Sequence, residues 1–228
     1  MQERKTLLPI FFVIETSGGM AGERIAIINI AMEKVIQSLK REILYDTQIR
    51  LSVLGFSSLS KWYLSSVDIE YIKWENLYAS GTADFGCACR ELNKILLADA
   101  EHVTSSTCIS SPIIILISLR DPTDDFINDL ETLKKNHIFN HSLKAAIAMD
   151  DDTNIDLLAI FTGTEHTVIN IKNINDSCKG ISWIIEEIIK AKKVVYDLPM
   201  NGDKDIYEME QDIFYNNVKD RKQKGNIN

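Results

Sequence analysis

The sequence predicts a three-layer α/β/α domain, in which a mostly parallel sheet lies between two layers of helices. Residues 7–14 and 113–119 are apolar at nearly every position, as expected of parallel strands buried on both faces. Residues 22–41 instead repeat apolar side chains every three or four positions, which indicates an amphipathic helix. Because strands and helices of this kind alternate along the chain, we expect an open sheet of about six strands with helices on both faces.

The other elements follow from the same two periodicities and from turn residues between them. Further strands are expected at residues 48–56, 64–74, 142–149 and 167–171, and further helices around residues 88–96, 123–136, 153–158 and 181–194. Thr123 or Asp124 is the expected N-cap of the helix that follows Pro122, because a short oxygen-bearing side chain satisfies the first backbone N–H groups of a helix.

Length and composition set the domain organisation. A chain of 228 residues exceeds the usual domain size of about 150 residues only modestly, so one domain is expected. We place that domain at residues 1–195. Residues 196–228 turn polar and acidic and are expected to be a C-terminal extension that is partly helical or disordered, since Ile206, Met209 and Ile213 have helical spacing.

The charge and the cysteines exclude several classes of protein. The chain carries 25 Lys and Arg against 33 Asp and Glu, a net charge of −8, which argues against a nucleic-acid partner. It has no apolar run of the roughly 20 residues that a membrane-spanning helix needs. No signal-peptide cleavage site follows the first apolar stretch. The four cysteines form no Cys-x-x-Cys pair and no dense framework, so reduced thiols and a cytoplasmic protein are expected.

Three segments rich in hydroxyl and carboxylate groups adjoin the predicted strands and helices. They are residues 15–19, 80–82 and 118–121. In a parallel sheet the carboxyl ends of the strands lie at one edge, and ligands bind there. Oxygen atoms of this kind are the ligands that a hard divalent cation prefers. The same glycines and hydroxyls are also typical of a tight turn that caps a helix, so both interpretations stay open.

Several motifs resemble those of von Willebrand factor A (VWA) domains, most closely the bacterial TerY-like branch associated with tellurium resistance. The resemblance covers residues 7–195. It rests on Leu8-Pro9-Ile10-Phe11-Phe12-Val13-Ile14-Glu15-Thr16-Ser17-Gly18-Gly19, on Leu51-Ser52-Val53-Leu54-Gly55-Phe56, on Ala79-Ser80-Gly81-Thr82 and on Pro122-Thr123-Asp124-Asp125-Phe126. It implies a Rossmann-like VWA fold with one antiparallel edge strand near residues 64–74, and binding of protein partners at the carboxyl ends of the strands.

The resemblance also implies a degenerate metal-ion-dependent adhesion site (MIDAS). In the family this site uses an Asp-x-Ser-x-Ser loop, a distant Thr and a distant Asp. Glu15, Ser17 and Thr82 stand at three of these positions, whereas Gly19 replaces the second Ser and Leu119 replaces the distant Asp. Mg²⁺ requires near-octahedral oxygen ligation, so a site that has lost two ligands is expected to bind the ion weakly or not at all. We therefore expect no cofactor, with weak Mg²⁺ binding as the exception.

The resemblance thus implies a non-catalytic protein-interaction module in a bacterial stress-response system. Its expected partner-binding residues are Glu15, Ser17, Gly18, Gly19, Thr82, Arg120 and Asp121. A further hypothesis is that Glu15 and Arg120 form a structural ion pair in place of the metal.

Three other functions remain open. One is a working Mg²⁺-dependent adhesion site. Another is a nucleotide-binding regulatory domain, although residues 17–22 lack the first glycine of the dinucleotide-binding pattern. The third is an enzyme, for which the predicted face offers Glu15, Asp84, Asp121 and Asp124.

Overall fold

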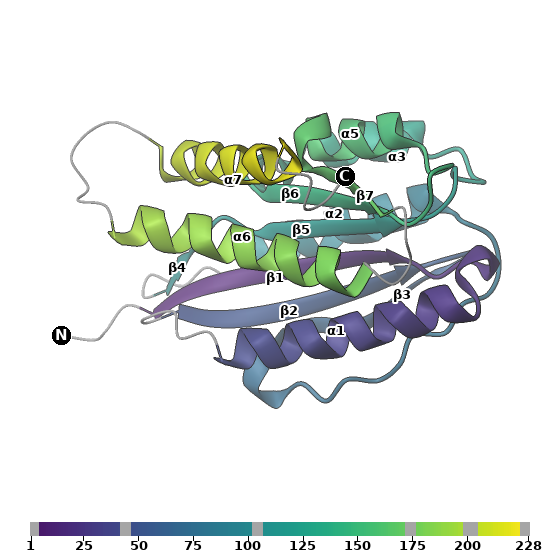
Figure 1. The fold of residues 1–228 in the computed structure, drawn as a ribbon, viewed down its shortest axis with the longest axis horizontal. Helices are drawn as coiled ribbons and strands as arrows, with labels where there is room; N and C mark the ends of the chain where they lie inside the picture. The colour runs from purple at the N-terminus through teal and green to yellow at the C-terminus, as the bar shows by residue number, and fades with distance from the viewer. Residues whose placement is uncertain (1–4, 42–46, 102–106, 172–176, 198–204, 224–228) are drawn as a thin grey trace.

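A computed structural model describes residues 5–41, 47–101, 107–171, 177–197 and 205–223. Its strands form a single sheet in the order β3-β2-β1-β5-β6-β7, and the short β4 pairs with the beginning of β1 (Figure 1). Their bounds are β1 Lys5–Glu15, β2 Thr47–Phe56, β3 Ser60–Asp68, β4 Thr107–Ile109, β5 Ile113–Ser118, β6 Leu143–Ala148 and β7 Val168–Asn170. All pairs are parallel except β2 with β3, which confirms the predicted mostly parallel sheet with one antiparallel edge strand.

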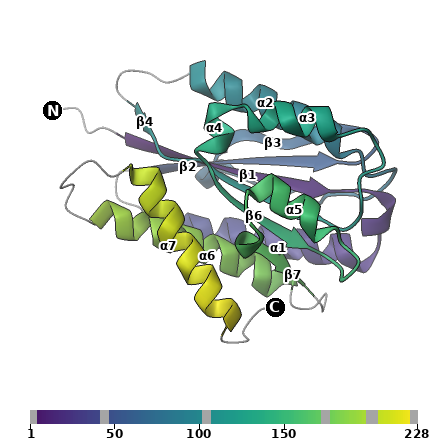
Figure 2. The same ribbon diagram turned by 90° about the horizontal axis from the view of Figure 1, so that it is seen from above.

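Helices cover both faces of this sheet. They are α1 Glu23–Arg41, α2 Phe85–Glu101, α3 Ile127–Lys134, α4 His137–Asn140, α5 Ile155–Thr162, α6 Ser177–Asp197 and α7 Ile206–Gln223. Figure 2 shows α2, α3 and α4 on one side of the sheet and α1, α6 and α7 on the other. The side chains of α5 pack into the same apolar cluster as those of α2 and α3. The three-layer α/β/α prediction is therefore confirmed.

The central strands owe their continuous apolar sequence to this double covering. Along β1, Phe12 and Ile14 pack into the cluster under α1 and α6, whereas Phe11 and Val13 pack into the cluster under α2. Successive side chains of a strand point to opposite faces, so a strand between two helical layers needs apolar residues at every position. All of these side chains are fully buried.

Several predicted elements begin elsewhere, among them the helix expected at 181–194, which is α6 and begins at Ser177. The edge strand β3 spans Ser60–Asp68 rather than residues 64–74, because a short 3-10 helix begins at Ile69. The helix after Pro122 begins at Ile127 rather than residue 123. Thr123 and Asp124 do not cap that helix, because their side chains accept hydrogen bonds from the backbone N–H groups of Ala83 and Gly86 around the start of α2. A side chain that caps a neighbouring element cannot be recognised from local sequence.

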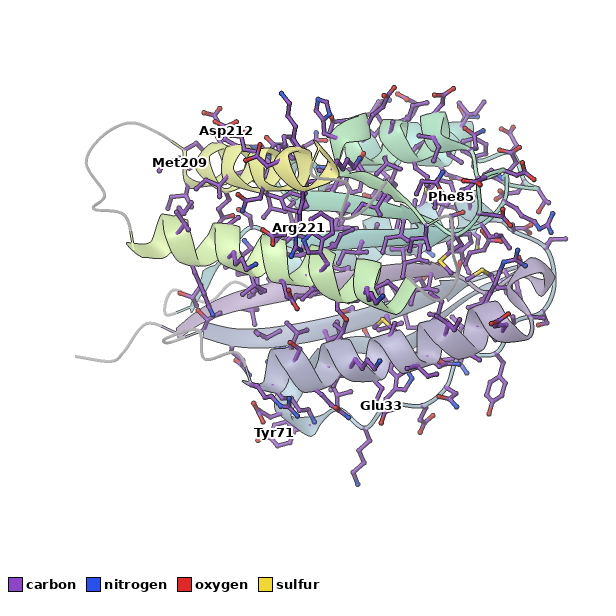
Figure 3. The ribbon with its side chains drawn as sticks, viewed as in Figure 1. Glu33, Tyr71, Phe85, Met209, Asp212 and Arg221 are labelled. Atoms are coloured by element: carbon purple, nitrogen blue, oxygen red, sulfur yellow. The ribbon has the colours of Figure 1, made fainter. Side chains whose placement is uncertain are left out.

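The C-terminal helix α7 crosses α6 at an angle and packs against it (Figure 2). Its Phe214 and Val218 are fully buried in the same apolar cluster as β1 and α1. Figure 3 shows Asp212 on the outer side of α7 and Arg221 on the side towards α6. The predicted division at residue 195 stays a prediction, and residues 198–204 and 224–228 lie outside the described part of the chain.

Two of the four cysteines have side chains that the structure describes. Cys87 and Cys89 are free thiols, whereas the side chains of Cys108 and Cys178 lie outside the described part. Among the described helices, none has the length and apolar character to cross a bilayer.

Candidate functional site

The carboxyl ends of β1, β2 and β5 lie side by side and carry the loops that the sequence singled out. Thr16 donates its backbone N–H to Phe56 O at 2.7 Å, and it accepts the N–H of Ser80 at 2.9 Å. Gly18 N–H bonds Gly81 O, also at 2.9 Å. We call residues 15–20, 57–59, 78–84 and 118–121 the strand-end face. These hydrogen bonds join its loops into one surface, so segments far apart in sequence act together.

Glu15 occupies the centre of this face and is completely buried. Its Oε1 accepts the hydroxyl of Ser17 at 2.6 Å, and its Oε2 accepts the hydroxyl of Ser118 at 2.9 Å. Oε2 also accepts the backbone N–H groups of Leu119 at 2.7 Å and Arg120 at 3.2 Å. A buried carboxylate is tolerated only when its charge is matched by donors of this kind. Glu15 therefore fastens the loop after β5 to the end of β1.

Leu119 and Arg120 surround Gly19. A Cβ atom built on Gly19 would lie 2.6 Å from Nε and 3.1 Å from Cδ of Arg120, and 3.2 Å from Cδ2 of Leu119. Leu119 is only 3% exposed and belongs to the apolar core, whereas Arg120 is exposed. The side chain of Arg120 thus lies directly over Gly19, in the space that a larger residue at position 19 would need.

The hypothesis of an ion pair between Glu15 and Arg120 is wrong in its geometry. The two residues do meet, but Arg120 reaches the carboxylate through its backbone N–H. Within the part of the chain that the structure describes, the Arg120 guanidinium makes no ion pair. Because Glu15 is already saturated by two hydroxyls and two backbone amides, the guanidinium is left to point over the surface.

Ser17 and Thr82 bind different partners. The hydroxyl of Ser17 donates to Glu15, whereas the exposed Thr82 has its hydroxyl 2.9 Å from that of Ser58. The N–H of Thr82 also bonds Ser58 Oγ at 3.0 Å. Sequence reasoning missed Ser58, because nothing in the hairpin between β2 and β3 marks it as a neighbour of Thr82. Gly81 makes this contact possible with a φ of +80°, a conformation that favours glycine.

Sequence reasoning also missed the apolar side chains on this face. Leu59 and Tyr78 are each 78% exposed. Leu59 lies in the hairpin next to Ser58, and Tyr78 lies two residues before Ser80, whose N–H is bound to Thr16. The sequence does not reveal whether an apolar residue in a loop is buried or exposed, so the exposure of these two side chains could be seen only in the folded chain.

The carboxylates considered as catalytic groups hold loops together. Asp84 accepts the hydroxyl of Thr123 at 2.7 Å, and Asp121 accepts the amide of Asn154 at 2.7 Å. Asp124 accepts the N–H of Gly86 at 2.9 Å. Each of these groups therefore has a structural partner.

Three lysines whose pKa burial lowers, Lys144, Lys192 and Lys222, lie outside the residues of the strand-end face. Burial lowers the pKa of Lys144 to about 8, and its ammonium donates to the carbonyl groups of Phe139 and Ser142. Burial is also the first cause that lowers the pKa of Lys192, which pairs with Glu210 on α7.

Several solved structures of other proteins share this architecture. The chain superposes on a von Willebrand factor type A protein from Catenulispora acidiphila with a TM-score of 0.58 and 10% identity, covering 80% of this chain and 42% of that one. It superposes on the ArnB paralog VWA2 from Sulfolobus acidocaldarius with a TM-score of 0.56 and 16% identity, covering 77% and 44%. The fold is that of a VWA domain.

A third similar structure is proximal thread matrix protein 1 from the mussel byssus with a zinc-occupied MIDAS motif, which has a TM-score of 0.56 and 12% identity over 80% of this chain and 46% of that one. This chain therefore spans less than half the length of these three proteins. No protein-family model and no curated protein matches the sequence.

The residues present here do not fit the metal ion that a MIDAS holds. The position of the distant Asp carries the buried Leu119, and the position of the second Ser carries Gly19 with the cationic Arg120 side chain over it. The remaining carboxylate, Glu15, has both oxygens engaged by protein donors. A divalent cation needs several oxygen ligands and is repelled by a nearby guanidinium.

Proposed function

We propose that this chain is a non-catalytic protein-interaction module that binds its partner at the strand-end face without a metal ion. The observation that carries the proposal is the replacement of expected metal ligands by Gly19 and Leu119, with the Arg120 side chain over Gly19 and both oxygens of Glu15 engaged by protein donors. A face whose loops are joined by hydrogen bonds still offers a surface for a partner, even when it lacks ion ligands. The exposed Leu59 and Tyr78 give that surface the apolar character of an interface centre.

The cellular role belongs to the same proposal. The motifs that resemble TerY-like proteins, above all Pro122-Thr123-Asp124-Asp125-Phe126, favour a bacterial stress-response system related to tellurium resistance. The sequence has no Cys-x-x-Cys pair and no dense cysteine framework, which favours reduced thiols and therefore a cytoplasmic location. The expected partner-binding residues are Ser17, Gly18, Gly19, Thr82, Arg120 and Asp121, with Glu15 beneath them.

Two of the alternative functions receive less support from the geometry. A nucleotide-binding regulator would need free backbone N–H groups in the glycine loop, but those of Gly18, Met20 and Ala21 already bond Gly81, Ser17 and Gly18. An enzyme would need convergent titratable groups in reach of a substrate, but the carboxylates of this face hold the loops.

Metal binding gives the first test. Titration of the full chain with Mg²⁺ or Mn²⁺ by calorimetry should show no saturable binding, and neither ion nor a nucleotide should raise the melting temperature, because only ligands of the native state do so. A combined Glu15→Asp, Gly19→Ser, Leu119→Asp and Arg120→Gly variant serves as the matched control for a rebuilt site. Micromolar binding to the wild type that Thr82→Ala abolishes would show that the site works as a metal site.

Partner binding gives the second test. Tagged wild-type chain, crosslinked in a lysate of the source cells, should enrich the same proteins with Mg²⁺ and with EDTA. The Leu59→Asp and Tyr78→Asp variants should lose that enrichment, because a charge at an interface centre is costly to desolvate. An Ile127→Asp variant is the matched control, since Ile127 is exposed on α3 outside the face. Enrichment that depends on Mg²⁺, or that survives both face variants, contradicts the proposal.

A further inference from the structure

The strand-end face contains one cation. Arg120 is the only Lys or Arg in residues 15–20, 57–59, 78–84 and 118–121. The acidic groups of the same segments are each engaged: Glu15 by four donors, Asp84 by Thr123 and Asp121 by Asn154. Within the described residues, the carboxylates of this face are thus bound by neutral donors, and the Arg120 guanidinium makes no ion pair.

The backbone of Arg120 is held from below. The backbone N–H of Arg120 is bound to the buried carboxylate of Glu15, which sets where its side chain starts. Its Cδ and Nε then lie against Gly19, and a Cβ atom there would force them to move. Arg120 is an exposed residue, so a partner can reach its guanidinium. Its planar set of N–H donors matches a carboxylate.

The surroundings of Arg120 connect it to the apolar part of the face. Gly19 adjoins Gly18, which bonds Gly81, and Gly81 in turn adjoins Ser58, the neighbour of the exposed Leu59. These contacts link the loop beneath Arg120 to the hairpin that carries the exposed Leu59. Asp121 follows Arg120 directly in the chain, so a densely acidic segment or a nucleic acid would meet repulsion there.

From this arrangement we infer that Arg120 is a carboxylate receptor, which binds a single Asp or Glu side chain of a partner segment whose neighbouring residues are apolar. The inference rests on the proposed function and names its partner chemistry. The carboxylate pairs with the guanidinium, and the apolar neighbours cover Leu59 and Tyr78 and exclude water from the pair. Glu15 is the positioning residue, since it acts only through the backbone of Arg120.

Selection from a random peptide display library on the immobilised full chain tests this inference. Enriched peptides should share one acidic residue next to apolar residues. A synthetic consensus peptide should lose about tenfold in affinity with Arg120→Gln, and by a similar factor when its acidic residue is changed to the amide. EDTA should change neither value. Arg90→Gln is the matched control, because Arg90 lies on α2 and pairs with Asp129.

The outcomes separate this inference from the proposed function. Enrichment without an acidic residue, or equal affinity for Arg120→Gln, overturns the carboxylate receptor. If Leu59→Asp still abolishes peptide binding in that case, the interaction face itself stands. Failure to enrich any peptide also counts against the receptor, because a site for one carboxylate with apolar neighbours predicts recognition of a short segment. Unchanged melting temperatures of Arg120→Gln and Arg90→Gln verify that both variants are folded.

Discussion

Replacement of Glu15 with alanine should lower the free energy of unfolding by about 3 kcal/mol or more, since each buried donor left without a partner costs about 1–3 kcal/mol. The change removes the acceptor of two hydroxyls and two backbone N–H groups at the centre of the strand-end face. Leu119, whose N–H is one of these donors, is itself buried. Urea denaturation followed by circular dichroism measures the difference.

Glu15→Gln is the matched control for this prediction. The amide keeps one oxygen that can accept the N–H groups of Leu119 and Arg120, so the loss should be smaller, about 1–2 kcal/mol. A Glu15→Ala variant within about 1 kcal/mol of the wild type would mean that the carboxylate does not hold the loop after β5.

Loss of the Glu210 carboxylate should destabilise the chain by about 3–5 kcal/mol, the usual cost of leaving one partner of a buried ion pair alone. The side chains of Lys192 on α6 and Glu210 on α7 are only 6% and 5% exposed, and their charged atoms are 2.9 Å apart. Ser110 is the other described partner of the ammonium, at 3.0 Å. Thermal and urea unfolding of Glu210→Ala measure the effect.

The double variant Lys192→Met and Glu210→Met is the control that distinguishes the effect of the two charges on stability from the effect of packing these side chains. It should approach the stability of the wild type, because two apolar side chains need no mutual compensation. If the double variant is as unstable as Glu210→Ala, the packing of these side chains rather than their charges holds α7.

The pH dependence of Glu210→Ala follows from the lowered pKa of Lys192. Burial lowers that pKa from its ordinary value of 10.5, and Glu210 opposes the shift. Without Glu210 the pKa of Lys192 in the native state should fall further below 10.5. The native state then binds fewer protons than the unfolded state over a wider pH range than it does in the wild type. Stability rises with pH wherever the unfolded state binds more protons. The penalty of Glu210→Ala should therefore shrink as the pH is raised towards that value.

The strands and helices of the core could be predicted from the sequence, because buried apolar side chains recur at a spacing that is typical of each kind of element. The unbroken apolar runs in β1 and β5, and the helical spacing in α1, each show how many faces of the element are covered. The residues at which helices begin were harder to predict. Asp124 is a good N-cap residue, yet it binds the N–H of Gly86 in a distant element. Local sequence gives the capacity to cap but does not name the helix that is capped.

The candidate site divides in the same way. The sequence by itself, through its resemblance to VWA domains, predicts Glu15, Ser17 and Thr82 at MIDAS-like positions. It also determines that the side chains of Gly19 and Leu119 offer no oxygen ligand, because ligand chemistry is a property of the residue type. Only the tertiary structure decided that Glu15 is saturated by backbone N–H groups and that Arg120 lies over Gly19. Such contacts depend on where chain segments about 100 residues apart meet, and that position is set by packing of the whole sheet.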